Sequence, residues 1–285
     1  MTPLERGSLV HQILERFLRW VIAAGTMPEP GEAWNKSHQQ TLLGLARDAF
    51  VEAESRGISG KALLWQMEQG DILADLDAFL EEDSLLRERF GVSPQLVEAK
   101  FGLAGGSWPE AVLDLGEGQT LRFRGVIDRV DTDRSGQRVL VIDYKTGRSA
   151  YYEGLKKDPV DGGRKLQLPV YALAAQGALG HDVQVSAAYW FVTSRGKFAL
   201  MPPEALNLEA VQERFREALT TISSGIRAGM FPANPGSPDR GGFQHCTNCD
   251  FNSLCPSRRE VFWNQKKRDP RLASYLKLSG EEDQI

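Results

Sequence analysis

The sequence predicts an α/β protein in which helices flank a central mixed β-sheet, with a helical region before the sheet and a cysteine-rich segment after it. Apolar residues recur at helical spacing as far as residue 90. From about residue 94, apolar and polar residues alternate as they do in strands. Three cysteines cluster near the C-terminal end. We therefore expect a helical region at residues 1–93, a sheet-containing core at 94–231 and a cysteine-rich tail at 232–285.

The first element expected is a long helix. Thr2 and Glu5 fit a capping box, with Pro3 at the first helical position. Apolar residues from Leu9 onward then recur at helical spacing, and further amphipathic segments lie at 40–55, 61–69 and 71–90. His11 lies beside the apolar stripe of the first helix. Considered alone, it is typical of a structural histidine.

Strands dominate the expected core. They are predicted at 96–103, 120–130 and 139–144, with a hairpin turn at 131–137 that is rich in Asp, Ser and Gly. A helix at 168–179, strands at 183–193 and 197–201, and an amphipathic helix at 208–228 follow. The tail from residue 232 has a loop-like composition. This order of helices, strands, helix and strands is typical of an α/β fold with a mixed sheet.

Composition limits the classes of protein. The chain has 285 residues, 41% of them hydrophobic, and no apolar run approaches the roughly 20 residues of a membrane span. The N-terminus lacks a signal-peptide pattern, so we expect a cytoplasmic protein with no membrane partner. The net charge of −4 argues against a non-specific nucleic-acid coat. It does not exclude an enzyme acting on nucleic acid, because metal-binding carboxylates make such a site acidic.

Two of the expected strands end in carboxylates. Asp128 ends one, and Asp143 ends the next, with Lys145 two residues later. Since side chains alternate between faces along a strand, Asp143 and Lys145 should project from the same side. Carboxylates can hold Mg²⁺, and a lysine beside the metal can orient water or offset charge. The three residues therefore predict a hydrolytic site; the alternative is a set of solvated strand ends.

Three further polar residues are candidates with open alternatives. Glu98 lies on the first expected strand, where a surface glutamate is the alternative. Gln167 and Tyr171 are four residues apart and share a helical face. Their amide and phenol could contact a phosphate or hold a catalytic side chain; the alternative is a helix cap and a partly buried tyrosine.

The cysteines form a C-x2-C-x5-C pattern of Cys246, Cys249 and Cys255. Three thiolates this close predict zinc or an iron–sulfur cluster, both of which take four ligands. His245 could complete a Cys₃His zinc site, although adjacent residues converge on one metal awkwardly. Otherwise the fourth ligand is missing from this chain.

Together these residues resemble the PD-(D/E)XK nuclease superfamily, specifically its RecB-like branch and most closely the nuclease domains of AddB-type helicase–nuclease subunits. The matching segments occur in the family's order and cover nearly the whole chain. They are residues 7–11 (GSLVH), Glu98, residues 125–131 (GVIDRVD), 142–147 (IDYKTG) and 167–171 (QLPVY), and the cysteine run.

The resemblance implies a restriction-endonuclease-like core at 94–231 and hydrolysis of phosphodiester bonds in DNA by a metal-activated water. It implies an exonuclease module in recombinational DNA repair. The ligands of the catalytic Mg²⁺ or Mn²⁺ would be His11, Asp128, Asp143 and the Tyr144 carbonyl. The other catalytic residues would be Lys145, Glu98, Gln167 and Tyr171.

In iron–sulfur members of the family, a fourth cysteine upstream of the first helix completes a [4Fe–4S] cluster with the three C-terminal ones. This sequence has no such cysteine. We expect a fragment of a longer protein, or else an absent or incomplete cluster, with zinc as the alternative metal. The expected partners are DNA and a helicase subunit or helicase-like region. Two alternatives stay open: a catalytically silent DNA-binding or scaffold module, and an unrelated zinc-binding protein.

Overall fold

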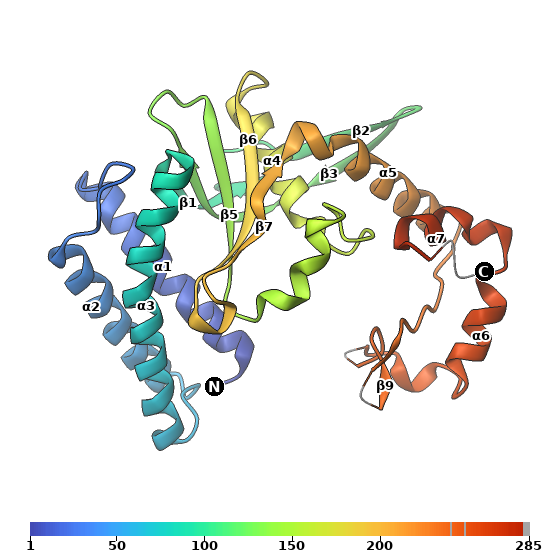
Figure 1. The fold of residues 1–285 in the computed structure, drawn as a ribbon, viewed down its shortest axis with the longest axis horizontal. Coiled ribbons are helices and arrows are strands. Elements are labelled where there is room, and N and C mark those ends of the chain that lie inside the picture. Colours follow the sequence, from blue (N-terminus) through green and yellow to red (C-terminus); the bar gives the residue numbers. More distant parts are fainter. Residues whose placement is uncertain (240, 248, 282–285) are drawn as a thin grey trace. The chain divides into compact units, whose positions relative to one another are not determined.

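The structure, a computed structural model, describes residues 1–239, 241–247 and 249–281. The chain forms two compact units, shown as a ribbon in Figure 1. Unit 1 comprises Met1–Pro159 and Lys165–Glu213, and unit 2 comprises Val160–Arg164 and Arg214–Ile285. In the described part of the chain, none of the helices combines the length and the apolar character needed to cross a membrane.

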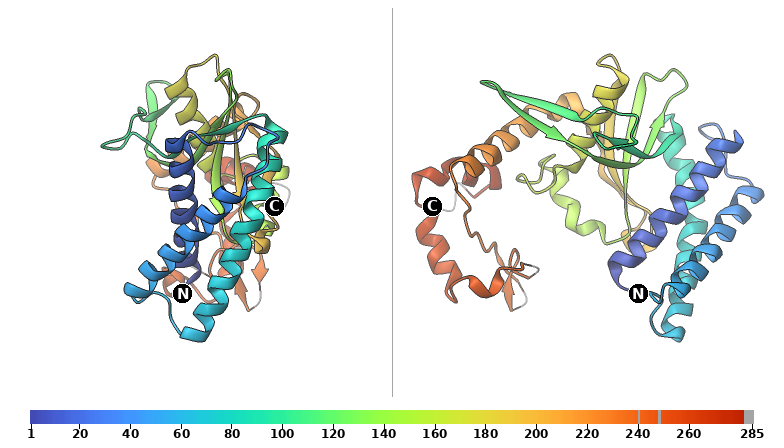
Figure 2. Two further views of the ribbon diagram at one scale, coloured as in Figure 1. Left: turned by 90° about the vertical axis from the view of Figure 1, so that its left-hand side faces the viewer. Right: turned by 180° about the vertical axis from the view of Figure 1, so that it is seen from behind.

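Three long helices open unit 1 and pack against one face of its sheet (Figures 1 and 2): α1 (Pro3–Ala24), α2 (Lys36–Ser55) and α3 (Ala62–Phe90). The predicted capping box of α1 is confirmed, because Glu5 N–H donates to Thr2 Oγ1 at 3.3 Å and Thr2 N–H donates to Glu5 Oε2 at 2.7 Å. The prediction of two segments at 61–69 and 71–90 was wrong. Helix α3 continues through Gly70, because burial of its apolar residues outweighs the roughly 1 kcal/mol cost of a helical glycine.

The main sheet of unit 1 has five strands in the order β1-β4-β5-β6-β7. The strands are β1 (Ser93–Phe101), β4 (Gly125–Thr132), β5 (Arg138–Lys145), β6 (Gln184–Phe191) and β7 (Leu200–Asn207). Strands β5 and β6 are parallel and the other pairs are antiparallel, so the predicted mixed sheet is confirmed. The parallel pair needs a long crossover. That crossover contains the 3₁₀ helix η1 (Ser149–Lys156) and helix α4 (Gln167–Leu179).

A second, two-stranded sheet was not predicted. Strands β2 (Ala111–Gly116) and β3 (Gln119–Phe123) form a hairpin, so the continuous strand expected at 120–130 is divided after Phe123. Its first part pairs with β2 and its second part pairs with β1. One stretch that was expected to form a single strand thus serves two sheets.

Side chains of β5 alternate between two cores, as its sequence predicted. Leu140, Ile142 and Tyr144 pack with the apolar faces of α1–α3. Val139 and Val141 pack on the opposite side with residues of α4. Asp143 and Lys145 therefore lie at the end of the α4 side.

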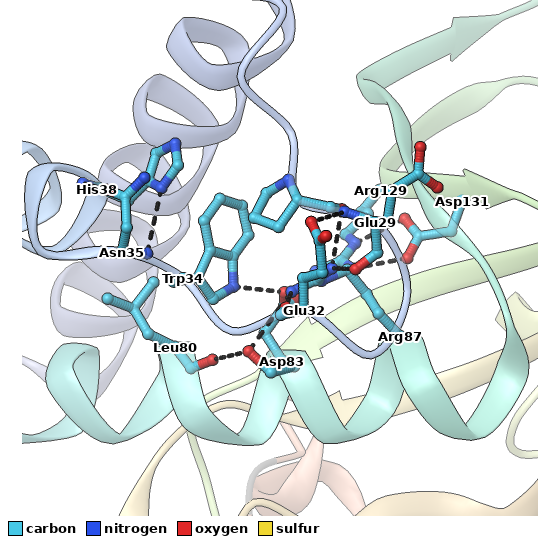
Figure 3. Close-up of polar contacts among 12 residues, drawn as sticks. Glu29, Glu32, Trp34, Asn35, His38, Leu80, Asp83, Arg87, Arg129 and Asp131 are labelled. Carbon is cyan, nitrogen blue, oxygen red and sulfur yellow. Dashed lines mark hydrogen bonds and ion pairs between the residues drawn. The ribbon is translucent and has the colours of Figure 1, made fainter.

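A buried cluster of charges joins α3 to β4 (Figure 3). Arg129 of β4 donates from Nε and Nη2 to the two carboxylate oxygens of Asp131, both at 2.6 Å, and from Nη1 to Asp83 of α3 at 2.5 Å. Asp83 also accepts hydrogen bonds from Arg87 and from the Trp34 indole, both at 2.8 Å. The four charged side chains are fully buried, and their charges balance.

Arg87 extends this cluster to the loop between α1 and α2. Its guanidinium donates to the carbonyl oxygens of Pro28, Glu29 and Glu32 at 2.8–3.0 Å. It also lies over the Trp34 ring, 5.0 Å from the ring centroid. The loop's carbonyl groups are thereby hydrogen-bonded although the loop has no regular structure.

The regular secondary structure of unit 2 is mainly helical in its described part. Helix α5 (Leu208–Arg227) enters it and is followed by the short strands β8 (Pro238–Asp239) and β9 (Gly242–Phe243). The 3₁₀ turns η3 (Asn252–Leu254) and η4 (Pro270–Leu272) accompany two helices, α6 (Arg259–Lys266) and α7 (Ala273–Ser279). The loop-like tail predicted from composition therefore contains two helices. They surround a small apolar core of Trp263, Leu272 and Leu276.

Replacing Arg129 should destabilise the protein strongly. Arg129→Met leaves the carboxylates of Asp83 and Asp131 buried with less compensating charge, and we expect a loss of about 3–5 kcal/mol in the free energy of unfolding. Urea unfolding measures the loss. Arg134→Met is the matched control, because it removes an ion pair to Glu29 whose side chains are 87% and 60% exposed, and should change stability by under about 1 kcal/mol. Equal stability of the two variants would contradict the assigned role of the cluster.

Candidate active site

The pairing of strands β4 and β5 ends just before Asp128 on β4 and Asp143 on β5. Their pairing runs from Thr132↔Val139 to Arg129↔Ile142 and ends there. The Tyr144 N–H lies beyond the last pair and donates instead to Asp128 Oδ2 at 2.7 Å. The Asp128 carboxylate thus takes the place of a strand carbonyl and is held beside the backbone of Asp143 and Lys145.

Asp143, Lys145 and Gln167 form a closed set of polar contacts between β5 and α4. Gln167 Nε2 donates to Asp143 Oδ1 at 2.5 Å, and Lys145 Nζ donates to Gln167 Oε1 at 3.3 Å. An ion pair between Lys145 Nζ and Asp143 Oδ2 closes the set. Gln167 Nε2 also donates to the Tyr171 hydroxyl at 2.9 Å. The structure therefore brings these four predicted residues together, with one amide orienting both the acid and the lysine.

Helix α1 brings His11 to the same place. His11 Nδ1 lies 3.5 Å from Asp128 Oδ2. Helix α1 approaches the end of β5 closely at Gly7. A Cβ at this position would lie 3.2 Å from Oγ1 of Thr146, the residue that follows Lys145. Gly7 and His11 are one helical turn apart, so contact at the first presents the second toward β4.

Glu98 lies across from Asp128 on the neighbouring strand. The pairs Val97↔Arg129 and Ala99↔Ile127 place it opposite Asp128 in the β1–β4 register. Its φ of +50° is unusual for a residue other than glycine, and such strain concentrates at functional sites. Glu98 thus adds a third carboxylate to the site.

The carboxylates of this site are short of positive charge. Burial raises the pKa of Asp143 to about 6; the charge of Lys145 opposes this rise and the charge of Asp128 adds to it. Burial, together with the charges of Asp128 and Glu15, raises the pKa of Glu98. The site therefore disfavours three ionised carboxylates and would favour a cation.

Burial and the neighbouring polar groups of this site also shift the pKa values of His11 and Tyr171. Burial lowers the pKa of His11, but the hydrogen bond and charge of Asp128 outweigh burial and raise it above its ordinary value. Burial raises the pKa of Tyr171 to about 12, against the effect of its hydrogen bond with Gln167. Tyr171 therefore stays protonated at neutral pH and acts here as a neutral hydrogen-bonding group.

The donor set fits a hard divalent cation. Mg²⁺ usually takes only one or two protein carboxylates, with water and substrate phosphate completing its shell. Asp143 Oδ2 is buried, and its contact within the described residues is the ion pair with Lys145 Nζ. Among residues 1–239, 241–247 and 249–281, no three His, Cys, Asp or Glu side chains are already arranged to hold an ion. Asp128 and Asp143, which meet where β4 and β5 part, could supply two carboxylates to such an ion.

Tyr144 contributes to this site through its backbone. Its phenol lies on the other face of the sheet, where its oxygen is 3.5 Å from Arg129 Nη1. Burial raises the pKa of this phenol far above its ordinary value. The side chain therefore belongs to the buried charge cluster, while the backbone N–H contacts Asp128.

The cysteines of the described part of unit 2 include two joined by a backbone hydrogen bond, from Cys249 N–H to the Cys246 carbonyl at 3.3 Å. Cys246, Cys249 and Cys255 form no metal-ligand group there, alone or with His245. The His245 ring lies against Gly236, and its Nδ1 is 3.3 Å from the Asn234 carbonyl oxygen. The arrangement does not fit the predicted zinc or iron–sulfur ligand set.

Asp75 was missed by the sequence analysis. It is buried on α3, where Oδ1 accepts the Ser194 N–H at 2.8 Å and Oδ2 accepts a hydrogen bond from Arg6 at 3.0 Å. The turn held in this way, η2 (Ser194–Gly196), follows Thr193, whose hydroxyl donates to the Thr146 carbonyl at 3.3 Å. Asp75 thereby supports the backbone next to Lys145. Its sequence signal is a carboxylate inside the apolar stripe of a helix.

Comparison with known proteins agrees with this geometry. The family model described as the PD-(D/E)XK nuclease superfamily matches residues 1–256. The chain is 26% identical over 181 residues to an ATP-dependent helicase/deoxyribonuclease subunit from Ruminiclostridium cellulolyticum, a match that covers 60% of this chain and 14% of the relative. It is also 26% identical over 177 residues to the protein of the same name from Clostridium acetobutylicum, with the same two shares.

The chain thus spans about a seventh of the length of these curated relatives. The family match, in contrast, covers most of the chain and contains every segment that builds the site on β4, β5, α1 and α4. On this evidence, the chain belongs to the PD-(D/E)XK nuclease superfamily.

Proposed function

We propose that this chain is a Mg²⁺- or Mn²⁺-dependent deoxyribonuclease that hydrolyses phosphodiester bonds. The observation that carries the proposal is the meeting of Asp128, Asp143 and Lys145 where β4 and β5 part, with Gln167 oriented against the last two. Membership of a nuclease superfamily supports it, as does the word deoxyribonuclease in the names of both relatives.

The cation would be held by the carboxylates of Asp128 and Asp143, with His11 and the Tyr144 carbonyl as further ligands. When bound, it supplies a Lewis acid for a phosphoryl oxygen and a water of lowered pKa. Glu98, opposite Asp128 in the register, would support this water or the cation. The raised pKa of Asp143 favours the same assignment, because a cation would replace the proton on that carboxyl.

Lys145 would act on the substrate. Gln167 and Asp143 hold its ammonium at the end of β5, where it can stabilise the negative charge that develops on the phosphate oxygens. Gln167 is a positioning residue in this arrangement, since it orients Lys145 and Asp143 together. Tyr171 in turn fixes the Gln167 amide.

We further propose that the chain acts as an exonuclease module in DNA repair, together with a helicase subunit or a helicase-like region. The support is the pairing of helicase and deoxyribonuclease in the names of the relatives. No step of the reaction is assigned to an iron–sulfur cluster or to zinc, because the described cysteines do not form a ligand set.

Removing the acid or the lysine should abolish cleavage. With Mg²⁺ and labelled DNA, Asp143→Ala and Lys145→Ala should each lose at least about 100-fold in rate, because they remove a cation ligand and a charge that stabilises the transition state. Lys36→Ala, which removes an exposed lysine of α2, should cleave like the wild type. Chelation of the divalent cation should stop cleavage by the wild type. Equal rates for Asp143→Ala and the wild type would show that the site is assigned wrongly.

Asp143 should make stability depend on pH. Its folded pKa of about 6 exceeds the ordinary value of 3.8, so the stability linked to its protonation is fully present below about pH 4 and is lost as pH rises through 6. Without divalent cations, Asp143→Asn should therefore gain on the order of 3 kcal/mol relative to the wild type between pH 4 and pH 7.

Thermal unfolding of both proteins across this pH range measures the gain. Added Mg²⁺ should stabilise the wild type at pH 7 and leave the melting temperature of Asp143→Asn nearly unchanged. A difference between the two proteins that stays constant with pH would contradict the assigned titration.

A further inference from the structure

An exposed tyrosine stands directly after the active-site strand. The chain leaves β5 at Lys145 and enters η1 (Ser149–Lys156), whose Tyr151 side chain is 76% exposed. Among the described residues of unit 1, the other exposed aromatic side chain is Trp20 of α1, at 39%. A single exposed aromatic residue needs no explanation by itself. Tyr151 differs from such a residue because its segment is anchored in the core, follows the proposed active-site strand and contains several basic residues.

The segment that carries Tyr151 is firmly anchored. The neighbouring Tyr152 packs against the rings of Tyr189 and Phe191, with centroids 4.8 and 5.2 Å apart. Leu155, one turn later, is buried in the core on the α4 side of the sheet. Packing of Tyr152 and Leu155 therefore anchors the backbone on the C-terminal side of Tyr151, and the Tyr151 ring projects into solvent from this anchored segment.

The anchored segment lies beside the proposed catalytic lysine. The Tyr189 ring that packs on Tyr152 also lies under Lys145, whose Nζ is 4.9 Å from the ring centroid. A Cβ on Gly196 would be 2.9 Å from the Gly147 carbonyl oxygen, so the η2 turn packs on the start of this segment. Tyr151 thus lies on the segment that follows Lys145, next to a residue that packs on the same Tyr189 ring as Lys145 does.

The segment that carries Tyr151 is rich in basic residues although the chain is acidic. Residues 145–157 contain four basic residues and one acidic residue, whereas the whole chain has a net charge of −4. Arg148 and Lys157 are exposed, and neither side chain forms an ion pair with a described residue. Arg195, in the adjoining turn, is also exposed. Positive charge beside an exposed ring is the combination that binds a nucleic-acid strand with unpaired bases.

We propose that Tyr151 is a stacking platform for an unpaired base of the substrate strand, next to the phosphodiester that is cleaved. Arg148 and Lys157 contact phosphates of the same strand. The inference rests on the proposed nuclease function and assigns a substrate-positioning residue to it. A base within a duplex is already stacked on both faces, so the platform favours single-stranded DNA at this position.

The test is binding of a single-stranded oligonucleotide that carries 2-aminopurine, measured without divalent cations so that no cleavage is required. Tyr151→Ala should weaken binding at least about fivefold, the lower end of the effect of losing one stacked base. Tyr151→Phe keeps the ring and should bind like the wild type. Quenching of 2-aminopurine should be seen with the wild type and Tyr151→Phe and be lost with Tyr151→Ala.

Trp20→Ala is the matched control, because it removes an exposed ring from α1 and should leave both binding and quenching unchanged. Arg148→Ala should reduce the slope of log affinity against log salt by about 0.7, the value for one phosphate contact on a single strand, whereas Lys36→Ala should not. Binding of a blunt duplex should be equal for Tyr151→Ala and the wild type. Melting temperatures of all variants establish that they are folded.

The inference is overturned if Tyr151→Ala binds and quenches like the wild type, or if Tyr151→Phe loses as much as Tyr151→Ala. A wild-type protein that does not bind the single strand overturns it as well. Failure of the proposed nuclease function would give a different result. The wild type would not cleave DNA with Mg²⁺, but Tyr151→Ala would still weaken binding.

Discussion

The buried contact of Arg129 with Asp83 and Asp131 is the constraint on which the site depends. Arg129 directly follows Asp128 on β4, and its guanidinium is held from two elements, α3 and β4 itself. The same guanidinium lies 3.5 Å from the hydroxyl of Tyr144, which directly follows Asp143 on β5. One buried cation therefore connects the residues adjacent to both proposed metal-binding carboxylates. It does so from the face of the sheet that packs against α3.

Such a cluster is better explained by specificity than by net stability. Burying four charges costs desolvation energy that their attraction offsets only in part. In return it specifies the register of β4 in the sheet, because a slip of one residue would turn Arg129 away from α3 to the other face. Helix α3 uses a second buried carboxylate, Asp75, in a similar way to hold the turn behind Thr146. The helical layer thus positions the sheet residues as well as covering them.

Much of the fold followed from local patterns, and the parts that did not follow depend on contacts between distant segments. Strand alternation correctly placed Asp143 and Lys145 on one face, and the Thr2 capping box predicted the start of α1. No local pattern shows that β4 and β5 part beyond Arg129, so the contact from the Tyr144 N–H to Asp128 could not be foreseen. The prediction of one continuous strand at 120–130 failed for the same reason, because the neighbouring strands determine which sheet each part joins.

The two charge clusters of unit 1 differ in a way that favours the proposed chemistry. Around Asp83, two arginines face two aspartates, and the buried charges balance. At the candidate active site, Lys145 pairs with Asp143 and His11 lies against Asp128, but burial still raises the pKa of both Glu98 and Asp143. A fold that balances buried charge completely at one place and leaves it unbalanced a few residues away has a local conflict of the kind found at functional sites. Under the proposed function, a divalent cation would supply positive charge beside Asp128 and Asp143.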